Sequence, residues 1–170
     1  MKRPYPQKPS DAPDGTIWFG GPIRWFSISL IITGDDLSPD QVTQLFGVLP
    51  TRAHKKDVPI IRADGTVQRI PKIGTWEFQL TPTDTDEWDV DEAAKLLISQ
   101  FPDDLRLWAT LPVDAERKLS FGLDIEDANN RGFSLSPDIL RFVGDHNVRL
   151  DFDIYADASK LEDGAMRAPR

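Results

Sequence analysis

The sequence contains no cysteine, so it can form no disulfide bond and can hold no metal ion through thiolates. Its only two histidines, His54 and His146, do not lie beside a candidate nucleophile in a recognisable serine-histidine-aspartate arrangement. No apolar run approaches the roughly 18 residues that a membrane helix needs, and no glycine-rich phosphate loop is present. We therefore expect no cofactor, no metal and no membrane partner. The sequence does not decide whether the chain is an enzyme, but the lack of a catalytic motif argues against it.

The chain is acidic, and its charge is unevenly distributed. Its 170 residues carry a formal net charge of −8, with 39% hydrophobic and 28% charged residues. Residues 1–72 contain 10 lysines and arginines against 7 aspartates and glutamates, whereas residues 73–170 contain 10 against 21. This composition is typical of a soluble cytoplasmic domain, and its acidic half repels phosphate backbones, so we expect no nucleic-acid partner.

Length and composition predict one folded domain with two tails. Residues 1–15 are rich in proline and poor in aliphatic residues, and such a segment buries too little apolar surface to offset the entropy lost on ordering. We expect a disordered tail over residues 1–15, a single domain over residues 16–157 and a frayed C-terminal tail over residues 158–170.

One tetrapeptide, Leu-Ser-Pro-Asp, occurs twice, at residues 37–40 and 135–138. Each copy follows a segment with strand-like alternation and precedes a segment with helical spacing. Serine is favoured at the helix N-cap, proline at the first helical position, and aspartate near the positive end of the helix dipole. Each copy therefore predicts the start of a helix, and the repeat suggests two similar halves.

Alternation of apolar and polar residues predicts five strands, over residues 25–33, 74–80, 105–111, 118–126 and 148–155. Helical spacing and capping residues predict helices over residues 38–46, 89–101 and 136–143. The third and fourth strands are expected to form a hairpin. A small hairpin turn is also expected at Asp64-Gly65.

Every expected strand is amphipathic, and this property decides the fold class. The strands of a parallel sheet covered on both faces are almost continuously apolar, whereas alternation indicates one covered and one open face. The order β-α-β-α-β-β-α-β predicts an α+β fold with two layers, a five-stranded, mainly antiparallel sheet with about three helices on one face. The repeated strand-helix unit favours ferredoxin-like, pseudo-duplicated halves.

The polar side of these strands is the first candidate binding surface. Aromatic side chains among charges are typical of protein interfaces, and Trp108 and Tyr155 are expected on this side. The alternative is an ordinary solvated sheet face. The candidate residues for partner binding are Glu77, Arg106, Trp108, Asp124, Arg149, Asp151, Asp153 and Tyr155.

The densest group of cations lies in residues 51–56, which the preceding glycine and proline predict to be a loop. Arginine binds a carboxylate or a phosphate through two parallel hydrogen bonds. The alternative is a solvated basic loop. Asp35 and Asp36 lie nearby in the sequence, but their spacing matches no calcium loop, so we expect no metal there. The candidate residues for an anion site are Arg52, His54, Lys55, Lys56 and Trp76.

Several of these segments together resemble a known family. They are the strand over residues 28–33, the stretch Gly34-Asp35-Asp36-Leu37-Ser38-Pro39-Asp40, the Pro50-Thr51-Arg52-Ala53-His54 element, Gly74-Thr75-Trp76 and the closing segment 150–155. Over residues 25–156 the chain resembles a bacterial family catalogued only as a domain of unknown function, number 4279. The resemblance implies domain boundaries and no activity.

These observations favour a non-enzymatic, cytoplasmic protein-binding domain, and an immunity-type inhibitor of a bacterial toxin is its most concrete form. Small size, acidity and the lack of a catalytic motif motivate this hypothesis. A small-ligand or enzymatic site for an anion around residues 51–56 is the competing hypothesis. An oligomer built by edge-strand pairing is a third, and the sequence does not predict the oligomeric state.

Overall fold

The computed structural model describes residues 25–81, 89–125 and 133–156. The tails expected over residues 1–15 and 158–170 lie outside the described residues, as do both ends of the domain expected over residues 16–157. No helix within the described ranges has the length and apolarity needed to cross a membrane. In chain order the elements are β1 (Trp25–Gly34), α1 (Pro39–Phe46), β2 (Arg52–His54), β3 (Ile60–Ile61), β4 (Val67–Arg69), β5 (Gly74–Leu80), α2 (Val90–Ile98), α3 (Leu105–Trp108), β6 (Glu116–Ile125), α4 (Pro137–Asp145) and β7 (Arg149–Ala156).

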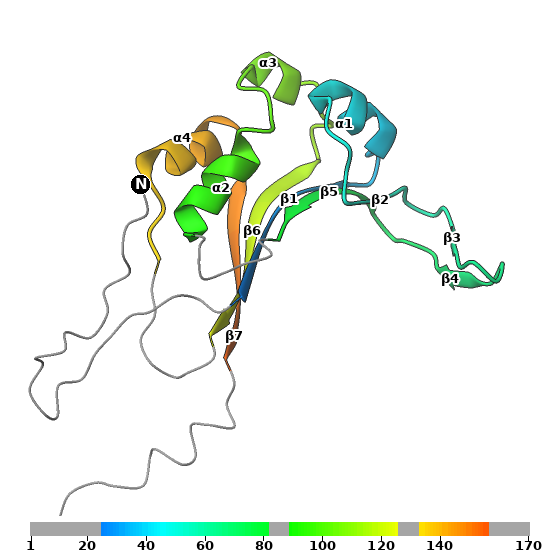
Figure 1. Ribbon diagram of the computed structural model, residues 1–170. Helices are drawn as coiled ribbons and strands as arrows, with labels where there is room; N and C mark the ends of the chain where they lie inside the picture. The colour runs from blue at the N-terminus through cyan, green and yellow to red at the C-terminus, as the bar shows by residue number, and fades with distance from the viewer. Residues whose placement is uncertain (1–24, 82–88, 126–132, 157–170) are drawn as a thin grey trace, which may run out of the picture.

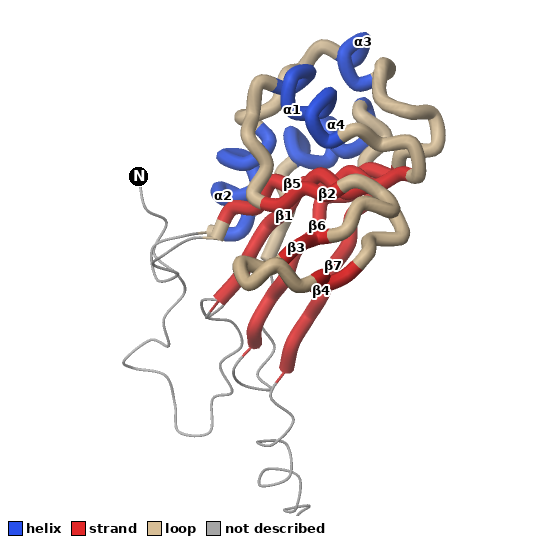
Figure 2. The backbone as a smooth tube through the Cα atoms, turned by 90° about the vertical axis from the view of Figure 1, so that its right-hand side faces the viewer, coloured by secondary structure: helices blue, strands red, loops and turns tan. Residues whose placement is uncertain are grey.

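Five strands form one mixed sheet in the order β2-β5-β1-β6-β7, and β3 and β4 form a separate two-stranded sheet. β1 is antiparallel to β5 and to β6, β2 is antiparallel to β5, and β6 is parallel to β7. The four helices of the described residues lie on one face of the five-stranded sheet (Figures 1 and 2). The expected α+β class is confirmed. The expected mainly antiparallel sheet is matched only in part, because β7 runs parallel to its neighbour.

The core lies between this face of the sheet and the helices. β1 is the central strand, and its side chains Phe26, Ile28, Leu30 and Ile32 are completely buried. They occupy every second position, so all four point to the same side. Removing each of them from water contributes about 1.5–3 kcal/mol, which favours covering this side with helices.

The strand and the hairpin expected at residues 105–111 are wrong, because this segment contains the short helix α3. Asp104 caps the helix, since its Oδ1 accepts a hydrogen bond from the backbone N–H of Arg106 at 3.0 Å. Trp108 is 1% exposed and donates its indole N–H to the carbonyl oxygen of Pro102 at 2.8 Å. One helical turn brings this large side chain into the core, and the gain from burying it outweighs the period-two pattern of the segment.

The fifth strand of the sheet comes instead from a segment that the sequence predicts to be a loop. β2 pairs with β5, which in turn pairs with β1, so β2 runs parallel to β1 with β5 between them. The second unit differs, because β7 lies directly beside β6. The two strand-helix-strand units are therefore similar but not equivalent, and the ferredoxin-like pseudo-duplication is matched only in part.

Both Leu-Ser-Pro-Asp copies begin a helix as expected, with Ser38 and Ser136 at the N-cap positions. The capping contacts differ from the expectation, because neither serine side chain makes a cap hydrogen bond. At the start of α4, Oδ1 of Asp91 accepts a hydrogen bond from the backbone N–H of Ser136 at 2.6 Å. The other oxygen of this carboxylate lies 2.6 Å from Lys95 Nζ. The carboxylate of Asp91 in α2 thus binds the N-terminal end of α4. No local sequence pattern predicts this contact.

We predict that Asp91→Ala lowers the free energy of unfolding by about 1–3 kcal/mol, because the partly buried N–H of Ser136 loses its acceptor. Glu92→Ala is the matched control, since Glu92 is exposed and carries the same charge in the same helical turn. This control should change stability by no more than about 0.5 kcal/mol. Urea-induced unfolding measures both, and equal effects would show that the contact with Ser136 does not stabilise the fold.

Candidate functional site

We call residues 51–56 the basic segment. The register of β2 and β5 decides which of its side chains lie next to residues of β5. Arg52 is paired with Glu77, and His54 is paired with Thr75. Directly paired residues point to the same face of a sheet, and successive residues alternate between faces. Arg52 and His54 therefore lie on the face away from the helices, which we call the open face. Trp76 lies on the helix-covered face.

Trp76 belongs to the core and not to an anion site. Its side chain is completely buried, and its indole N–H donates to Oγ1 of Thr43 in α1 at 3.0 Å. Its ring packs edge-on against Phe46 and Phe101, at centroid distances of 5.7 and 6.0 Å. The structure thus separates Trp76 from the basic residues with which the sequence grouped it.

Each lysine and arginine of the basic segment is paired with a carboxylate of the same chain. The pairs are Arg52 Nη2 to Glu77 Oε2 at 2.6 Å, Lys55 Nζ to Asp40 Oδ2 at 2.7 Å, and Lys56 Nζ to Asp35 Oδ2 at 2.7 Å. These ion pairs attach the segment to β5 and to the region around the start of α1. These carboxylates neutralise the positive charge to which an external anion would bind. Within the described parts of the chain, no three side chains form a metal-binding group.

His54 lies among positive charges. Burial lowers its pKa, and the guanidinium groups of Arg69 and Arg52 lower it further, while the carboxylate of Glu77 acts in the opposite direction. These influences favour the neutral imidazole in the folded protein. A neutral imidazole attracts an anion less strongly than an imidazolium would, so His54 adds little to an anion site.

His146 has a structural position in the core. It is 5% exposed, its Nδ1 lies 2.8 Å from the carbonyl oxygen of Phe142, and its ring stacks on that of Phe142 at a centroid distance of 4.3 Å. The ring of Trp108 packs edge-on against both rings, at centroid distances of 5.7 Å from Phe142 and 4.7 Å from His146. His146 follows the helix expected over residues 136–143, and only the tertiary structure shows that it is buried.

Most residues expected to bind a partner share the open face. The strand registers place six of them there, namely Glu77, Asp124, Arg149, Asp151, Asp153 and Tyr155. Trp108 is excluded because it lies in the core. Arg106 is excluded because it belongs to α3 on the helix side, where it pairs with Asp104 at 2.9 Å. The two misplaced residues share one cause, the wrong assignment of residues 105–111 to a strand.

The open face is buried at its centre and exposed towards β7. Ser27 and Ser29 of the central strand are 8% and 5% exposed. On the edge strand β7, by contrast, Arg149, Asp153 and Tyr155 are all exposed, and 61% of Tyr155 is accessible. A partner would therefore meet the open face mainly along β7.

Charges on β6 and β7 form a connected network on this face. Arg149 pairs with Glu116 and also approaches Asp151, with 3.6 Å between Nη2 and Oδ2. Lys118 Nζ lies 3.4 Å from the same oxygen of Asp151. These contacts hold the side chains of neighbouring strands in fixed positions, which limits the side-chain entropy that a partner must overcome on binding.

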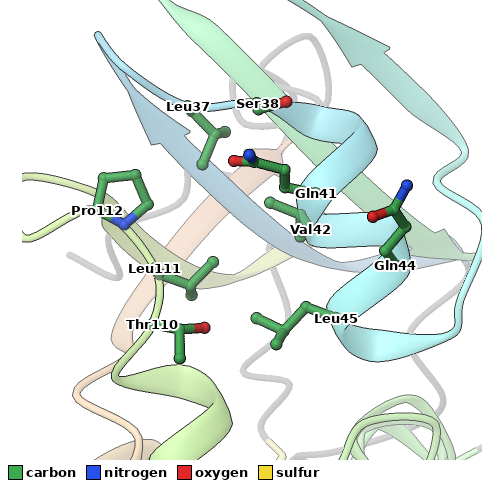
Figure 3. Close-up of a pocket in the computed structure, with 9 residues that line it drawn as sticks. All are labelled: Leu37, Ser38, Gln41, Val42, Gln44, Leu45, Thr110, Leu111 and Pro112. Carbon is green, nitrogen blue, oxygen red and sulfur yellow. The ribbon is translucent and has the colours of Figure 1, made fainter.

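A cavity of about 440 Å³ lies on the other side of the molecule, between α1 and the segment that follows α3 (Figure 3). Figure 3 shows Leu45 directed towards Thr110 and Leu111, and the amide of Gln41 beside Leu37. Its lining residues are Leu37, Ser38, Gln41, Val42, Gln44, Leu45, Thr110, Leu111 and Pro112, none of which is charged. It contains none of the residues predicted for the anion site. Sequence reasoning missed it because its two walls are far apart in the chain.

These features define a class of protein, an α+β domain whose mixed sheet has one helix-covered face and one polar open face. The sequence model of one family, described as Domain of unknown function (DUF4279), matches residues 24–157. The chain therefore belongs to the DUF4279 family, and the resemblance seen in its sequence is confirmed. Neither the comparison with curated proteins nor that with solved structures finds a match.

We predict that Arg52→Ala lowers the free energy of unfolding by about 1–3 kcal/mol, because the buried carboxylate of Glu77 loses its partner. Lys55→Ala is the control, since its ion pair with Asp40 is exposed and should contribute less than about 1 kcal/mol. The double variant Arg52→Ala/Glu77→Gln should recover part of the loss, because it removes the unpaired charge. Urea-induced unfolding measures all three, and a loss for Arg52→Ala no greater than for Lys55→Ala contradicts the structural role of Arg52.

A second prediction concerns pH. In the unfolded chain His54 has its ordinary pKa of 6.5, and in the folded chain its pKa is lower. The unfolded state therefore binds more protons as the pH falls below 6.5, so the stability contributed by neutral His54 is lost in this range. We expect His54→Gln to remove part of the decrease in stability between about pH 8 and about pH 5. Urea titrations of both proteins at each pH measure it, and parallel pH profiles would refute the shift.

Proposed function

We propose that the chain is a non-enzymatic protein-binding domain that docks a protein partner on the β7 side of its open face. The observation that carries this proposal is a polar sheet face on which exposed Tyr155 stands among Arg149, Asp151 and Asp153. No helix of the described residues lies on that face. An aromatic side chain within a rim of charges is typical of residues that contribute strongly to protein binding.

The anion-site alternative receives less support from the geometry. Arg52, Lys55 and Lys56 are paired within the chain, and Trp76 lies on the opposite face. The cavity of about 440 Å³ has an uncharged lining that includes no residue of the basic segment. These contacts give the basic residues structural roles, so the open face is the better candidate for recognition.

An immunity-type inhibitor of a toxin is the specific form that we propose, acting in the cytoplasm. The chain has a net charge of −8, and the exposed part of its open face carries several carboxylates. A toxin that cleaves nucleic acid needs a cationic surface to hold phosphates. An acidic face complements such a surface, which favours fast association and selects against other partners.

The test is capture of the product of a neighbouring toxin gene, expressed with the tagged native chain. We expect Asp153→Lys/Tyr155→Ala to reduce the captured amount at least about tenfold, because it removes the aromatic contact and reverses a charge. The matched control Arg106→Glu/Arg141→Glu changes two exposed charges on the helix side and should leave capture unchanged. Equal capture by the face variant, or the absence of both a toxin gene next door and any partner in the native lysate, contradicts the proposal.

A further inference from the structure

The hairpin of β3 and β4 projects from the edge of the five-stranded sheet and exposes much apolar surface. We call residues 57–73 the arm. Among the described strands, β3 and β4 pair only with each other. The turn expected at Asp64-Gly65 is confirmed at its tip, where Gly65 has a φ of +82°. The aliphatic side chains of the arm that are 41% to 55% exposed are Val58, Ile61, Val67, Ile70 and Ile73.

The arm is shaped by its own hydrogen bonds. At its base, the backbone N–H of Asp57 donates to the carbonyl oxygen of Pro71 at 2.8 Å. Near the tip, the backbone N–H of Arg62 donates to the carbonyl oxygen of Thr66 at 2.9 Å. A two-stranded hairpin is marginally stable at best in water, and exposed apolar patches of this kind mark interaction surfaces. The arm therefore fits a partner that covers its aliphatic side chains.

The arm and the far edge of the open face carry opposite charges. The arm contains three cations, Arg62, Arg69 and Lys72, and two carboxylates, Asp57 and Asp64, so its net charge is +1. The carboxylates at the β6–β7 end of the open face include Asp124, Asp151 and Asp153. Lys118 and Arg149 lie among these carboxylates, but they are paired with Asp151 and Glu116 of the same face. The surface thus has a basic end at the arm and an acidic end at β7.

The arm stands on the open side of the sheet. In Figure 1 it leaves the β2–β5 edge and extends away from the helices. In Figure 2, seen from that side, it lies in front of the strands. A surface with one basic and one acidic end complements itself under a two-fold rotation about an axis parallel to the strands, because each basic end then covers the acidic end of the other copy.

We propose that the protein forms a two-fold dimer in which the open faces of two copies meet and each arm packs against β7 of the other copy. Exposed Tyr155 of β7, which lies on the open face, then meets the aliphatic side chains of the arm. This arrangement covers those side chains and brings the cations of the arm next to the carboxylates of β6 and β7. The inference goes beyond the proposed function, because a second copy would use the same open face and would compete with a toxin for it.

The surface available for this contact lies at the two ends of the open face, because its centre is already buried at Ser27 and Ser29. The interface therefore consists of the two arms and the β7 edges that they cover. A small interface of this kind is typical of a weak dimer.

Charge-reversal variants test the arrangement by sedimentation equilibrium. The native protein should have twice the mass of the 170-residue chain. The arm variant Arg62→Glu/Arg69→Glu and the face variant Asp124→Lys/Asp153→Lys should each raise the dimer dissociation constant at least about tenfold, because like charges then meet at both contacts. An equal mixture of the two variants should dimerise again, since reversed arms meet reversed faces and native arms meet native faces.

The controls separate the possible results. Arg106→Glu/Arg141→Glu, on the helix side, should dimerise like the native protein. A monomeric native protein at about 100 µM overturns the dimer. A dimer that either reversal leaves intact, or a mixture that stays monomeric although both variants keep native circular dichroism, overturns the arm-to-face arrangement.

If one reversal misfolds, Ile61→Asp/Val67→Asp in the arm and Tyr155→Asp on β7 replace it, and each should give monomers. A monomeric native protein would not contradict capture of a toxin, and a protein that captures no toxin could still form the dimer.

Discussion

The apolar side of the central strand β1 is the constraint on which the rest of the structure depends. Phe26, Ile28, Leu30 and Ile32 are completely buried, and the strand is paired on both edges. Because side chains alternate along a strand, burying this side leaves the other side of β1 facing away from the helices. The helix layer and the open face are therefore two consequences of one pattern. The binding surface that we propose exists because the core needs only one face of the sheet.

The basic segment shows how charges that suggest a ligand site can be used within the fold. Glu77 is almost completely buried on β5, and a buried carboxylate needs a partner that compensates its lost hydration. Arg52 supplies this partner because β2 joins the sheet edge in the register that places the two side by side. Membership of the DUF4279 family adds no activity, and a fold does not imply a function. The open face and the arm are therefore the candidate recognition surfaces, because charged and apolar side chains are exposed together there.

Long periodic segments could be predicted from the sequence, and short ones could not. β1 and β5 have enough alternating residues for a clear pattern, and the Ser-Pro-Asp segments mark the starts of α1 and α4. Residues 105–111 alternate as well, but α3 has only four residues, and one helical turn is too short to show its own period. Burial of Trp108 decided its conformation. The same error placed Arg106 and Trp108 among the candidate binding residues, whereas the candidates on β5, β6 and β7 share a face as expected.

The sequence by itself determined which side of each long strand is apolar, where α1 and α4 begin, and that the acidic charge lies in the second part of the chain. Only the tertiary structure decided that β7 lies parallel to β6, that Asp91 binds the N–H of Ser136, and that Trp76 and Arg52 lie on opposite faces. The first group depends on side-chain alternation along the long strands and on the Ser-Pro-Asp sequence at the two helix starts, both of which are local features of the chain. The second depends on contacts between segments far apart in the chain, and the free energy of burial and pairing across the whole domain selects among the local alternatives.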